Sequence, residues 1–283
     1  MLQHTLPILN EAEGAAAHRS VDKTLALLRQ LSLDEFGEFI ISLPRDDYPA
    51  LTAMLPAMVS ENIQKTWTGA SGMELLRQSL TFARQVENNY ARYCGKPLRN
   101  STIMDFGCGY GRILRLMYYF SDPDRIWGVD AWQGSLDTCT EARMLGNFVK
   151  SENVPTSLAV GETQFDVAYA LSVFTHLAPT AADACLAAVR RHMKEGGLFI
   201  ATVRPVEYWR FHDQNRGTMV ADQMINKHAQ SGFAYVPHNG PEGETYGDAS
   251  VAFNFFKKPG WKVLGHDWSR QDMYQVSVVL QAA

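Results

Sequence analysis

The stretch IMDFGCGYGRILR, residues 103–115, constrains the fold of this chain more than any other part of its sequence. Apolar residues lead to an aspartate, then to three glycines at alternate positions, and then to an apolar helical pattern. This order predicts a strand, a tight turn and the start of a helix. Glycines adopt the backbone angles that such a turn needs and let a ligand approach the main chain. The stretch therefore predicts a nucleotide-like ligand at the turn.

The spacing of the three glycines, at positions 107, 109 and 111, narrows the kind of ligand. A phosphate-binding P-loop needs G-x-x-x-x-G-K-[ST], and the required lysine is absent here. The dinucleotide fingerprint G-x-G-x-x-G would place its third glycine at position 112, where this chain has Arg112. The pattern thus excludes a P-loop and disfavours, without excluding, a redox dinucleotide.

Asp130 follows the next apolar run, RIWGVD, and provides a second test. A carboxylate offers two acceptor oxygens for the two neighbouring hydroxyls of a ribose. The same spacing suits an NAD site, and a role as helix N-cap also stays open for Asp130. Ala131 and Trp132 would then flank the nucleoside, with Trp132 as a stacking surface.

Short apolar runs alternate with helical stretches from residue 101 onward, which predicts an α/β fold with βαβ units and a parallel sheet. Four of these runs are TIMDFG, RIWGVD, FDVAYALSVF and GGLFIATV. Two later runs, WKVLGHDW and QVSVVLQAA, predict an antiparallel pair that closes the sheet. The first third instead has helical periodicity, with helices expected over 20–31, 32–43 and 68–95. We expect a helical flank or lid over 1–98, a main domain over 99–283, and an insertion at about 206–255.

Several segments between residues 101 and 205 resemble class I S-adenosylmethionine-dependent methyltransferases. MDFGCGYGR resembles the first motif of that family, and FDVAYALSVFTHL resembles its fourth strand and the following loop in a bacterial small-molecule or glycan-type subgroup. RRHMKEGGLFIATVRP resembles the helix, turn and fifth strand that come next. The resemblance implies an enzyme with S-adenosylmethionine as cofactor. It also implies a Rossmann-like, mostly parallel seven-stranded sheet with an antiparallel last strand.

The resemblance places the glycine turn beside the methionine part of the cofactor and Asp105 near its amino group. Arg112 would bind the carboxylate of the cofactor, although a solvated position in the first helical turn stays open. The segment TWTGASG, residues 66–72, suits a lid. No clear acidic residue is present for the adenine amino group, so Phe148 and Glu152 are considered there. The predicted cofactor residues are Trp67, Gly72, Asp105, Gly107, Cys108, Gly109, Gly111, Arg112, Asp130, Ala131, Trp132, Phe148 and Ser172.

Methyl transfer to a hydroxyl or an ammonium group requires a base that removes a proton. His176 lies in the loop after the predicted fourth strand and has an ordinary pKa near 6.5, so it is the predicted catalytic base, with a structural role as the alternative. The segments after the fifth strand predict one wall of an acceptor pocket, although ordinary packing is equally compatible with each residue. The residues expected there are Arg204, Tyr208, Trp209, His212 and Tyr246, with His238 beside them in a specificity loop over 232–248.

The composition favours a small-molecule acceptor. The net charge of −4 gives no general attraction to nucleic acid, and the fourth strand lacks the Pro-Pro-aromatic motif of amino methyltransferases that act on nucleic acids. The four cysteines and the histidines are too scattered for a metal site or a disulfide framework, which fits a cytoplasmic protein without a membrane span. We expect O-methylation of a sugar, glycan intermediate or secondary metabolite. A non-catalytic S-adenosylmethionine-binding regulator and an NAD(P)-dependent oxidoreductase are the alternatives, and the sequence specifies no oligomeric state.

Overall fold

The computed structural model describes residues 2–238, 240 and 243–283. These residues form two compact units, the first made of residues 2–91 and 96–149 and the second of residues 92–95 and 150–283. Each unit contains part of the expected main domain, and the predicted boundary at residue 98 stays a prediction. The two units are described separately below.

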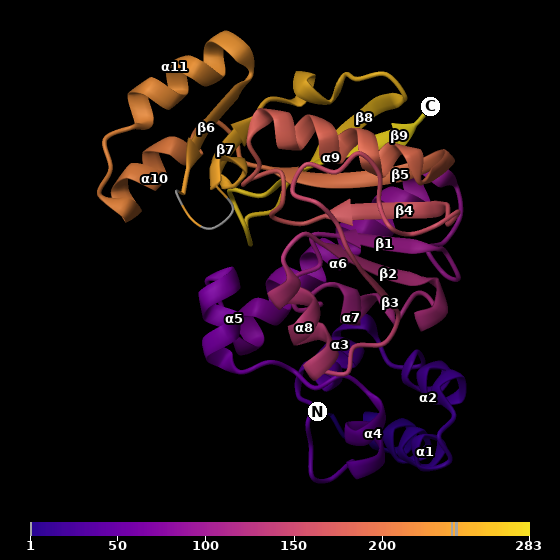
Figure 1. Ribbon diagram of the computed structural model, residues 1–283. Helices are drawn as coiled ribbons and strands as arrows, with labels where there is room; N and C mark the ends of the chain where they lie inside the picture. The colour runs from indigo at the N-terminus through magenta and orange to yellow at the C-terminus, as the bar shows by residue number, and fades with distance from the viewer. Residues whose placement is uncertain (1, 239, 241–242) are drawn as a thin grey trace. The chain divides into compact units, whose positions relative to one another are not determined.

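A seven-stranded sheet with the strand order β3-β2-β1-β4-β5-β9-β8 carries the fold (Figure 1). Within it β1 is parallel to β2 and β4 is parallel to β5, whereas β9 is antiparallel to both β5 and β8. The predicted fold class, a mostly parallel Rossmann-like sheet with an antiparallel last strand, is therefore confirmed. The strands are β1 (Ile103–Phe106), β2 (Ile126–Asp130), β3 (Asn147–Lys150), β4 (Phe165–Ala170), β5 (Met193–Val203), β8 (Trp261–Asp267) and β9 (Val276–Ala282).

The central strands are apolar along their length because helices cover both faces of a sheet of this kind. All four residues of β1 are buried, and so are the last seven residues of β5. Continuous burial explains why these strands appear in the sequence as unbroken apolar runs rather than as alternating patterns.

The first unit carries the helical flank that the sequence predicts. The expected helices over 20–31, 32–43 and 68–95 correspond to α2, α3 and α6. Ser32 and Glu35 form a reciprocal capping box at the start of α3, which satisfies backbone donors that would otherwise lack partners. The helices that begin here are α1 (Leu6–Ala17), α2 (Val21–Leu28), α3 (Leu33–Ile41), α4 (Pro49–Met54), α5 (Glu61–Thr68), α6 (Gly72–Cys94), α7 (Leu114–Met117) and α8 (Gln133–Glu141), with 3-10 turns at Gln3–Thr5 and Pro123–Arg125.

The second unit contains the predicted insertion, whose elements lie together in Figure 1. Its strands β6 and β7 pair in an antiparallel two-stranded sheet, and α11 precedes β6 directly. The expectation of a loop over 232–248 is therefore corrected, because β6 and the first residues of β7 occupy part of that range; residues 239, 241 and 242 lie outside the described residues. The remaining elements are α9 (Pro179–Arg191), α10 (Tyr208–Arg216), α11 (Ala221–Ser231), β6 (Phe233–Pro237) and β7 (Gly247–Val251), with 3-10 turns at Gly243–Thr245 and Phe253–Phe256.

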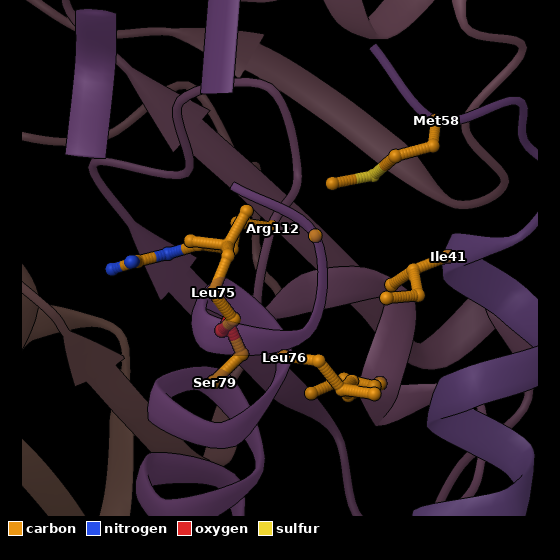
Figure 2. Close-up of a pocket in the computed structure, with 8 residues that line it drawn as sticks. Ile41, Met58, Leu75, Leu76, Ser79 and Arg112 are labelled. Carbon is orange, nitrogen blue, oxygen red and sulfur yellow. The ribbon is translucent and has the colours of Figure 1, made fainter. Parts of the chain in front are cut away.

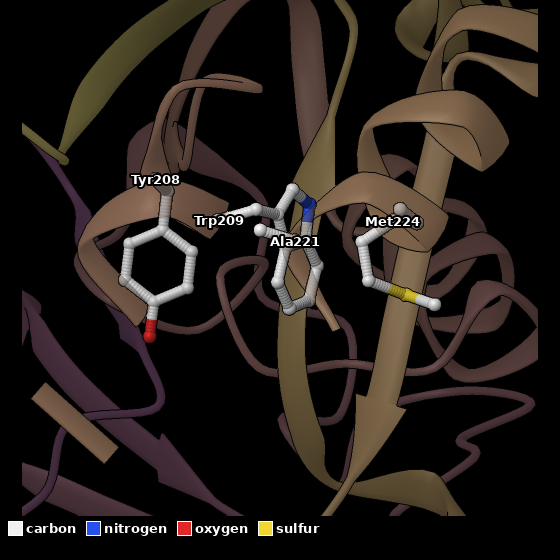
Figure 3. Close-up of a cluster of buried hydrophobic side chains, with 5 residues drawn as sticks. Tyr208, Trp209, Ala221 and Met224 are labelled. Carbon is white, nitrogen blue, oxygen red and sulfur yellow. The ribbon is translucent and has the colours of Figure 1, made fainter. Parts of the chain in front are cut away.

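An apolar cluster between α10, α11 and β6 holds the insertion together (Figure 3). Trp209 is fully buried there beside Ala221 and Met224, and its Nε1 donates a hydrogen bond to Ser250 Oγ at 2.7 Å. Burying an indole of this size with its polar atom satisfied stabilises the unit by about 2–3 kcal/mol. Trp209 therefore acts as core in this structure, which is the packing alternative left open from the sequence.

Among the described residues, no helix combines the length and the apolar character that crossing a bilayer would require.

Candidate functional site

The glycine turn lies in the first unit, directly after β1. Gly107, Gly109 and Gly111 all have positive φ angles, of 77°, 54° and 77°. A Cβ atom at Gly111 would overlap the side chain of Met144, so this position needs glycine for space as well as for backbone angle. The predicted tight turn is present and is incompatible with larger residues at its end.

Hydrogen bonds fix the turn to the end of β2. The N–H groups of Gly107 and Cys108 donate to the carbonyl oxygen of Val129, at 2.7 and 3.1 Å, and the N–H of Gly109 donates to Asp130 Oδ2 at 2.9 Å. Most of the turn's donors are thus satisfied within the protein. The turn offers a ligand a close approach to a preformed backbone rather than a set of free N–H groups.

Asp130 lies at the rim of this turn and is partly exposed. Besides Gly109, its carboxylate accepts a hydrogen bond from the N–H of Trp132 at 2.9 Å. Burial raises the pKa of Asp130, and the hydrogen bonds from Trp132 and Gly109 act in the opposite direction. Hydrogen bonds from Ser135 and from the backbone of Ala131 also act on this carboxylate, so a ribose hydroxyl would share an oxygen with one of the four donors or replace it. Asp130 fits the predicted ribose contact.

An aromatic surface covers the turn. Ring atoms of Trp67 lie 3.9 Å from the position that a Cβ would take at Gly109. The Trp67 ring lies 5.6 Å from that of Tyr110 and 5.0 Å from that of Trp132, measured between centroids. Trp132 is 54% exposed and therefore presents a free indole face. The structure brings Trp67 and Trp132 together although they lie 65 positions apart in the sequence.

Gly72 and Ala131 occupy supporting positions at this site. The N–H of Gly72 donates to Gln64 Oε1 at 3.0 Å, which ties the start of α6 to α5. Gly72 has a φ of 58° and open space around its Cα, so it positions the segment that carries Trp67. Ala131 connects Asp130 to Trp132 and is partly buried.

Phe148 and Cys108 form an apolar wall under the turn. A Cβ at Gly128 would lie 2.8 Å from the Phe148 ring and 3.0 Å from Cys108 Sγ, so both side chains pack on this glycine. A hydrogen bond from the Cys108 thiol to the Cys139 sulfur, together with burial, raises the pKa of Cys108, which keeps it protonated. Glu152, the other residue considered for adenine, is exposed.

Asp105 and Arg112 differ in their surroundings. Asp105 is buried at 3% exposure within β1, whereas Arg112 is partly buried after the turn. Arg112 contributes to a small pocket whose other labelled side chains are mainly apolar, and its guanidinium points away from Met58 and Ile41 (Figure 2). Because that lining offers few polar groups, the pocket suits apolar packing rather than a nucleoside.

Arg115 supports the turn from below, and sequence reasoning missed it. Its side chain is fully buried and donates to the carbonyl oxygens of Gly111 and Tyr110, at 3.2 and 3.4 Å. Burial lowers its pKa, since desolvation disfavours the charged form. The signal for this role was an arginine inside the apolar run RILRLM, where solvation is not expected.

The loop after β4 belongs to the second unit and begins at a strained residue. Ser172 has a φ of 62°, which is uncommon for a residue other than glycine. Its N–H donates to Thr202 Oγ1 at 2.7 Å, and its hydroxyl accepts from Gln275 Nε2 at 3.0 Å. These bonds hold the left-handed conformation, a kind of strain that is often found at functional sites.

The same loop is joined to β7 by backbone hydrogen bonds. Gly247 N–H donates to the carbonyl oxygen of His176, and Ala249 N–H donates to that of Thr175, each at 2.8 Å. The loop is therefore positioned by the insertion, which gives the insertion a direct part in building this site.

Asp248 on β7 is the centre of a buried polar cluster that sequence reasoning missed. Its Oδ1 accepts from Arg204 Nη1 at 2.6 Å and from the Tyr208 hydroxyl at 2.9 Å, and its Oδ2 accepts from His238 Nε2 at 2.8 Å. His212 Nε2 lies 3.4 Å from Oδ2. The carboxylate is 1% exposed. A charged residue within the otherwise small and apolar run GDASVAF was its only sequence signal.

The charges of this cluster determine its protonation. Burial alone would raise the pKa of Asp248, but the positive charge of Arg204 and the hydrogen bond from His238 lower it, and the net direction is downward. Arg216 also reaches Asp248 Oδ2 at 3.3 Å. One carboxylate thus faces two guanidinium groups, so the cluster keeps Asp248 ionised and has an excess of positive charge.

His176, the predicted base, has both ring nitrogens engaged. Its Nδ1 lies 2.7 Å from the carbonyl oxygen of Gly247, and its Nε2 lies 3.0 Å from Arg204 Nη2. Burial and the neighbouring charge of Arg204 lower the pKa of His176 to about 3. Tyr246 stacks on the same ring, with 4.9 Å between centroids and 12° between planes. The structure therefore brings His176, Arg204 and Tyr246 together, but it holds His176 neutral with no unpaired lone pair.

His176, His238 and Asp248 also place potential metal ligands within 4.8 Å of one another. The guanidinium of Arg204 donates to both Asp248 and His176 Nε2, the atoms that a cation would need. A cation there would face a fixed positive charge and lose the imidazole lone pair. The geometry therefore favours an ion-pair and hydrogen-bond network over a metal centre.

The comparisons with known proteins were consistent with this geometry. Residues 104–201 match a family model described as a methyltransferase domain, which confirms the resemblance to methyltransferases but does not test the subgroup. No curated protein matches the chain.

Solved structures share the fold at low sequence identity. A S-adenosylmethionine-dependent methyltransferase from Clostridium acetobutylicum is similar with a TM-score of 0.50 and 12% identity, over 78% of this chain and 96% of that one. The PH0226 protein from Pyrococcus horikoshii is similar with a TM-score of 0.52 and 15% identity, over 72% of this chain and 90% of that one. At these identities the likeness concerns the fold.

Proposed function

We propose that this chain, whose residues 104–201 match a methyltransferase domain, is a class I S-adenosylmethionine-dependent methyltransferase that methylates an oxygen atom of a small molecule. The acceptor class that we infer is a sugar, glycan intermediate or secondary metabolite with a free hydroxyl. The observation that carries the proposal is the preformed glycine turn, which is hydrogen-bonded to Asp130 and covered by Trp67 and Trp132.

The residues present fit the cofactor of this family. Asp130 places a carboxylate at the rim of the turn for the ribose hydroxyls, and Trp132 offers an exposed indole face for stacking on adenine. Phe148 and Cys108 supply the apolar wall, and Asp105 and Arg112 would face the methionine end. When bound, S-adenosylmethionine supplies an electrophilic methyl group on a positively charged sulfur. The protein's own contribution is to align this group with the acceptor and to exclude water.

The acceptor side of the proposal rests on the cluster around Asp248 in the second unit. Arg204, Tyr208 and His212 contact Asp248, and Tyr246 lies at the surface with 37% exposure. Tyr246 is open to a small acceptor, and so is Arg216, a half-exposed side chain that also contacts Asp248. A cluster with excess positive charge, ionised at neutral pH, suits a polar acceptor better than an apolar one.

The proposal is tested by a screen of small hydroxyl compounds with S-adenosylmethionine labelled in its methyl group. We expect label in at least one sugar or phenolic compound, formed together with an equal amount of S-adenosylhomocysteine. Label found only in added nucleic acid or protein would contradict a small-molecule acceptor. Tight S-adenosylmethionine binding without transfer to any compound class would support the regulatory alternative.

A further inference from the structure

Arg115 is a buried cation without an anionic partner. It lies on α7, directly after the glycine turn, and is fully buried. Within residues 2–238, 240 and 243–283, no carboxylate forms an ion pair with its guanidinium. A buried charge that lacks an ion-pair partner reduces stability. The hydrogen bonds of Arg115 therefore have to account for its place in the fold.

Two of these bonds fix the carbonyl side of the glycine turn. Arg115 Nε donates to the carbonyl oxygen of Gly111 at 3.2 Å, and Nη2 donates to that of Tyr110 at 3.4 Å. The N–H side is held separately, because the N–H of Gly109 donates to Asp130 Oδ2 at 2.9 Å. The turn is thus fixed on one side by the end of β2 and on the other side by Arg115.

Two further contacts join the turn to more distant segments. Arg115 Nη1 donates to the carbonyl oxygen of Ala57, in the loop between α4 and α5, at 3.3 Å. Its Nη2 also lies 3.4 Å from Met144 Sδ, and the Met144 side chain occupies the space that a Cβ at Gly111 would need. One guanidinium therefore connects the turn, the loop before α5 and the segment after α8.

The loop before α5 leads into the helix that carries Trp67. Gln64 on this helix is buried, and its Nε2 donates to the carbonyl oxygen of Val59, just before the helix, at 2.7 Å. Ring atoms of Trp67, three residues later, lie 3.9 Å from the position that a Cβ would take at Gly109. Arg115 therefore holds the segment from which the aromatic cover of the turn begins.

These contacts depend on the geometry of a guanidinium. Its planar fork donates in several fixed directions at once, whereas the ammonium group of a lysine is a compact and strongly hydrated point charge. Arg115 is also too deeply buried to touch a ligand, so it acts through the backbone of the turn rather than by direct contact.

We propose that Arg115 is the positioning residue of the ligand site in the first unit: it fixes the shape of the glycine turn and keeps Trp67 against it. This inference rests on the proposed function, because S-adenosylmethionine is the ligand proposed for the turn. Every residue that it uses belongs to the first unit. Loss of the guanidinium should leave the fold intact but release the turn and Trp67, so that ligand affinity falls.

The binding arm of the test compares Arg115→Met with the wild type by calorimetric titration of S-adenosylmethionine. Methionine removes the buried charge and fills much of the space, so the variant should fold. We expect the dissociation constant to rise about 10- to 100-fold, the effect of losing hydrogen bonds to a charged group. Arg115→Lys should also bind weakly, because it keeps the charge but lacks the fork.

Arg29→Met is the matched control. Arg29 is also a largely buried arginine of the first unit, and it donates to the carbonyl oxygens of Tyr118 and Ser121, at 2.8 and 2.7 Å. These carbonyls follow α7 and lie outside the glycine turn. We expect wild-type affinity in this variant. Equal losses in Arg29→Met and Arg115→Met would indicate a general effect of stability and would overturn the proposal.

The spectroscopic arm needs no ligand. NMR of protein labelled with ¹⁵N-tryptophan reports each indole N–H, and the signals are assigned with Trp67→Phe and Trp209→Phe. We expect Arg115→Met to move the Trp67 signal and to leave that of Trp209, in the core of the second unit, unchanged. A general loss of stability would not separate the two signals in this way. A Trp67 signal that stays in place would overturn the proposal.

The two arms distinguish failure of this inference from failure of the proposed function. An affinity of Arg115→Met within twofold of wild type, in protein whose unfolding curve is normal, would remove Arg115 from the site. Wild-type protein that binds no S-adenosylmethionine would instead overturn the proposed function, while the Trp67 signal would still decide whether Arg115 holds the turn and α5 together. Should Arg115→Met fail to fold, Arg115→Lys provides the same two comparisons.

Discussion

Replacing Asp130 by alanine should weaken binding of S-adenosylmethionine without unfolding the protein. The carboxylate accepts hydrogen bonds from the N–H groups of Gly109 and Trp132, each at 2.9 Å, and lies at the rim of the turn, where the ribose hydroxyls would bind. A hydrogen bond to a charged group contributes about 1.5–3 kcal/mol. Losing the ribose contact alone therefore predicts a decrease in affinity of about 10- to 150-fold.

Calorimetric titration of S-adenosylmethionine into the wild type and the variant measures this decrease. Asp130→Asn should give a smaller loss, because one oxygen acceptor remains. Asp137→Ala is the control, since Asp137 lies on α8, is exposed and accepts a hydrogen bond from Gln133 on the same helix. An Asp130→Ala affinity within twofold of wild type, in protein whose unfolding curve is normal, would refute the assignment of Asp130 to the cofactor.

Three further predictions follow from the two sites. His176 has a pKa of about 3 when folded and about 6.5 when unfolded, so the unfolded chain binds the extra proton and stability falls as pH drops through that window. Between pH 7 and 5, urea unfolding should show the wild type losing about 2 kcal/mol more than His176→Gln; equal losses would contradict the buried neutral ring. Trp67→Ala should weaken S-adenosylmethionine binding about 2- to 10-fold by calorimetry, because the ring against Gly109 contributes about 0.5–1.5 kcal/mol, and tighter binding would mean that Trp67 blocks the site. Arg204→Met should lower the free energy of unfolding by about 3–5 kcal/mol, since it leaves Asp248 buried without its main partner, and a loss below about 1 kcal/mol would argue against a structural ion pair.

Local patterns predicted the glycine turn of the first unit because the determinants of its shape are close in sequence. The three alternating glycines and the following apolar helix are contained in residues 103–115, and their positive φ angles are what such a motif requires. The position of Asp130 at the end of the next strand was predictable for the same reason, because that strand is a short apolar run nearby in the sequence. The start of α3 is also determined locally, because Ser32 and Glu35, three residues apart, cap it.

The cluster around Asp248 could be predicted only in part, because its contacts join residues far apart in the sequence. Asp248 receives hydrogen bonds from Arg204 and His238, and no periodicity links residues so far apart. His176 was selected for an ordinary pKa near 6.5, but burial and Arg204 change that value. Trp209 is an aromatic residue of a kind that often lines binding pockets, so the sequence placed it there. Its burial in the core depends on packing, which the sequence does not show.

The preformed turn beside Asp130 is the centre of this account, and ligand choice at that turn tests it most directly. Calorimetric titration of the wild-type protein with S-adenosylmethionine, S-adenosylhomocysteine and NADH makes the comparison in one buffer. We expect saturable binding of the two adenosyl-sulfur compounds at one site per chain and no heat of binding for NADH. Binding of NADH alone would contradict the account and return the turn to the dinucleotide class.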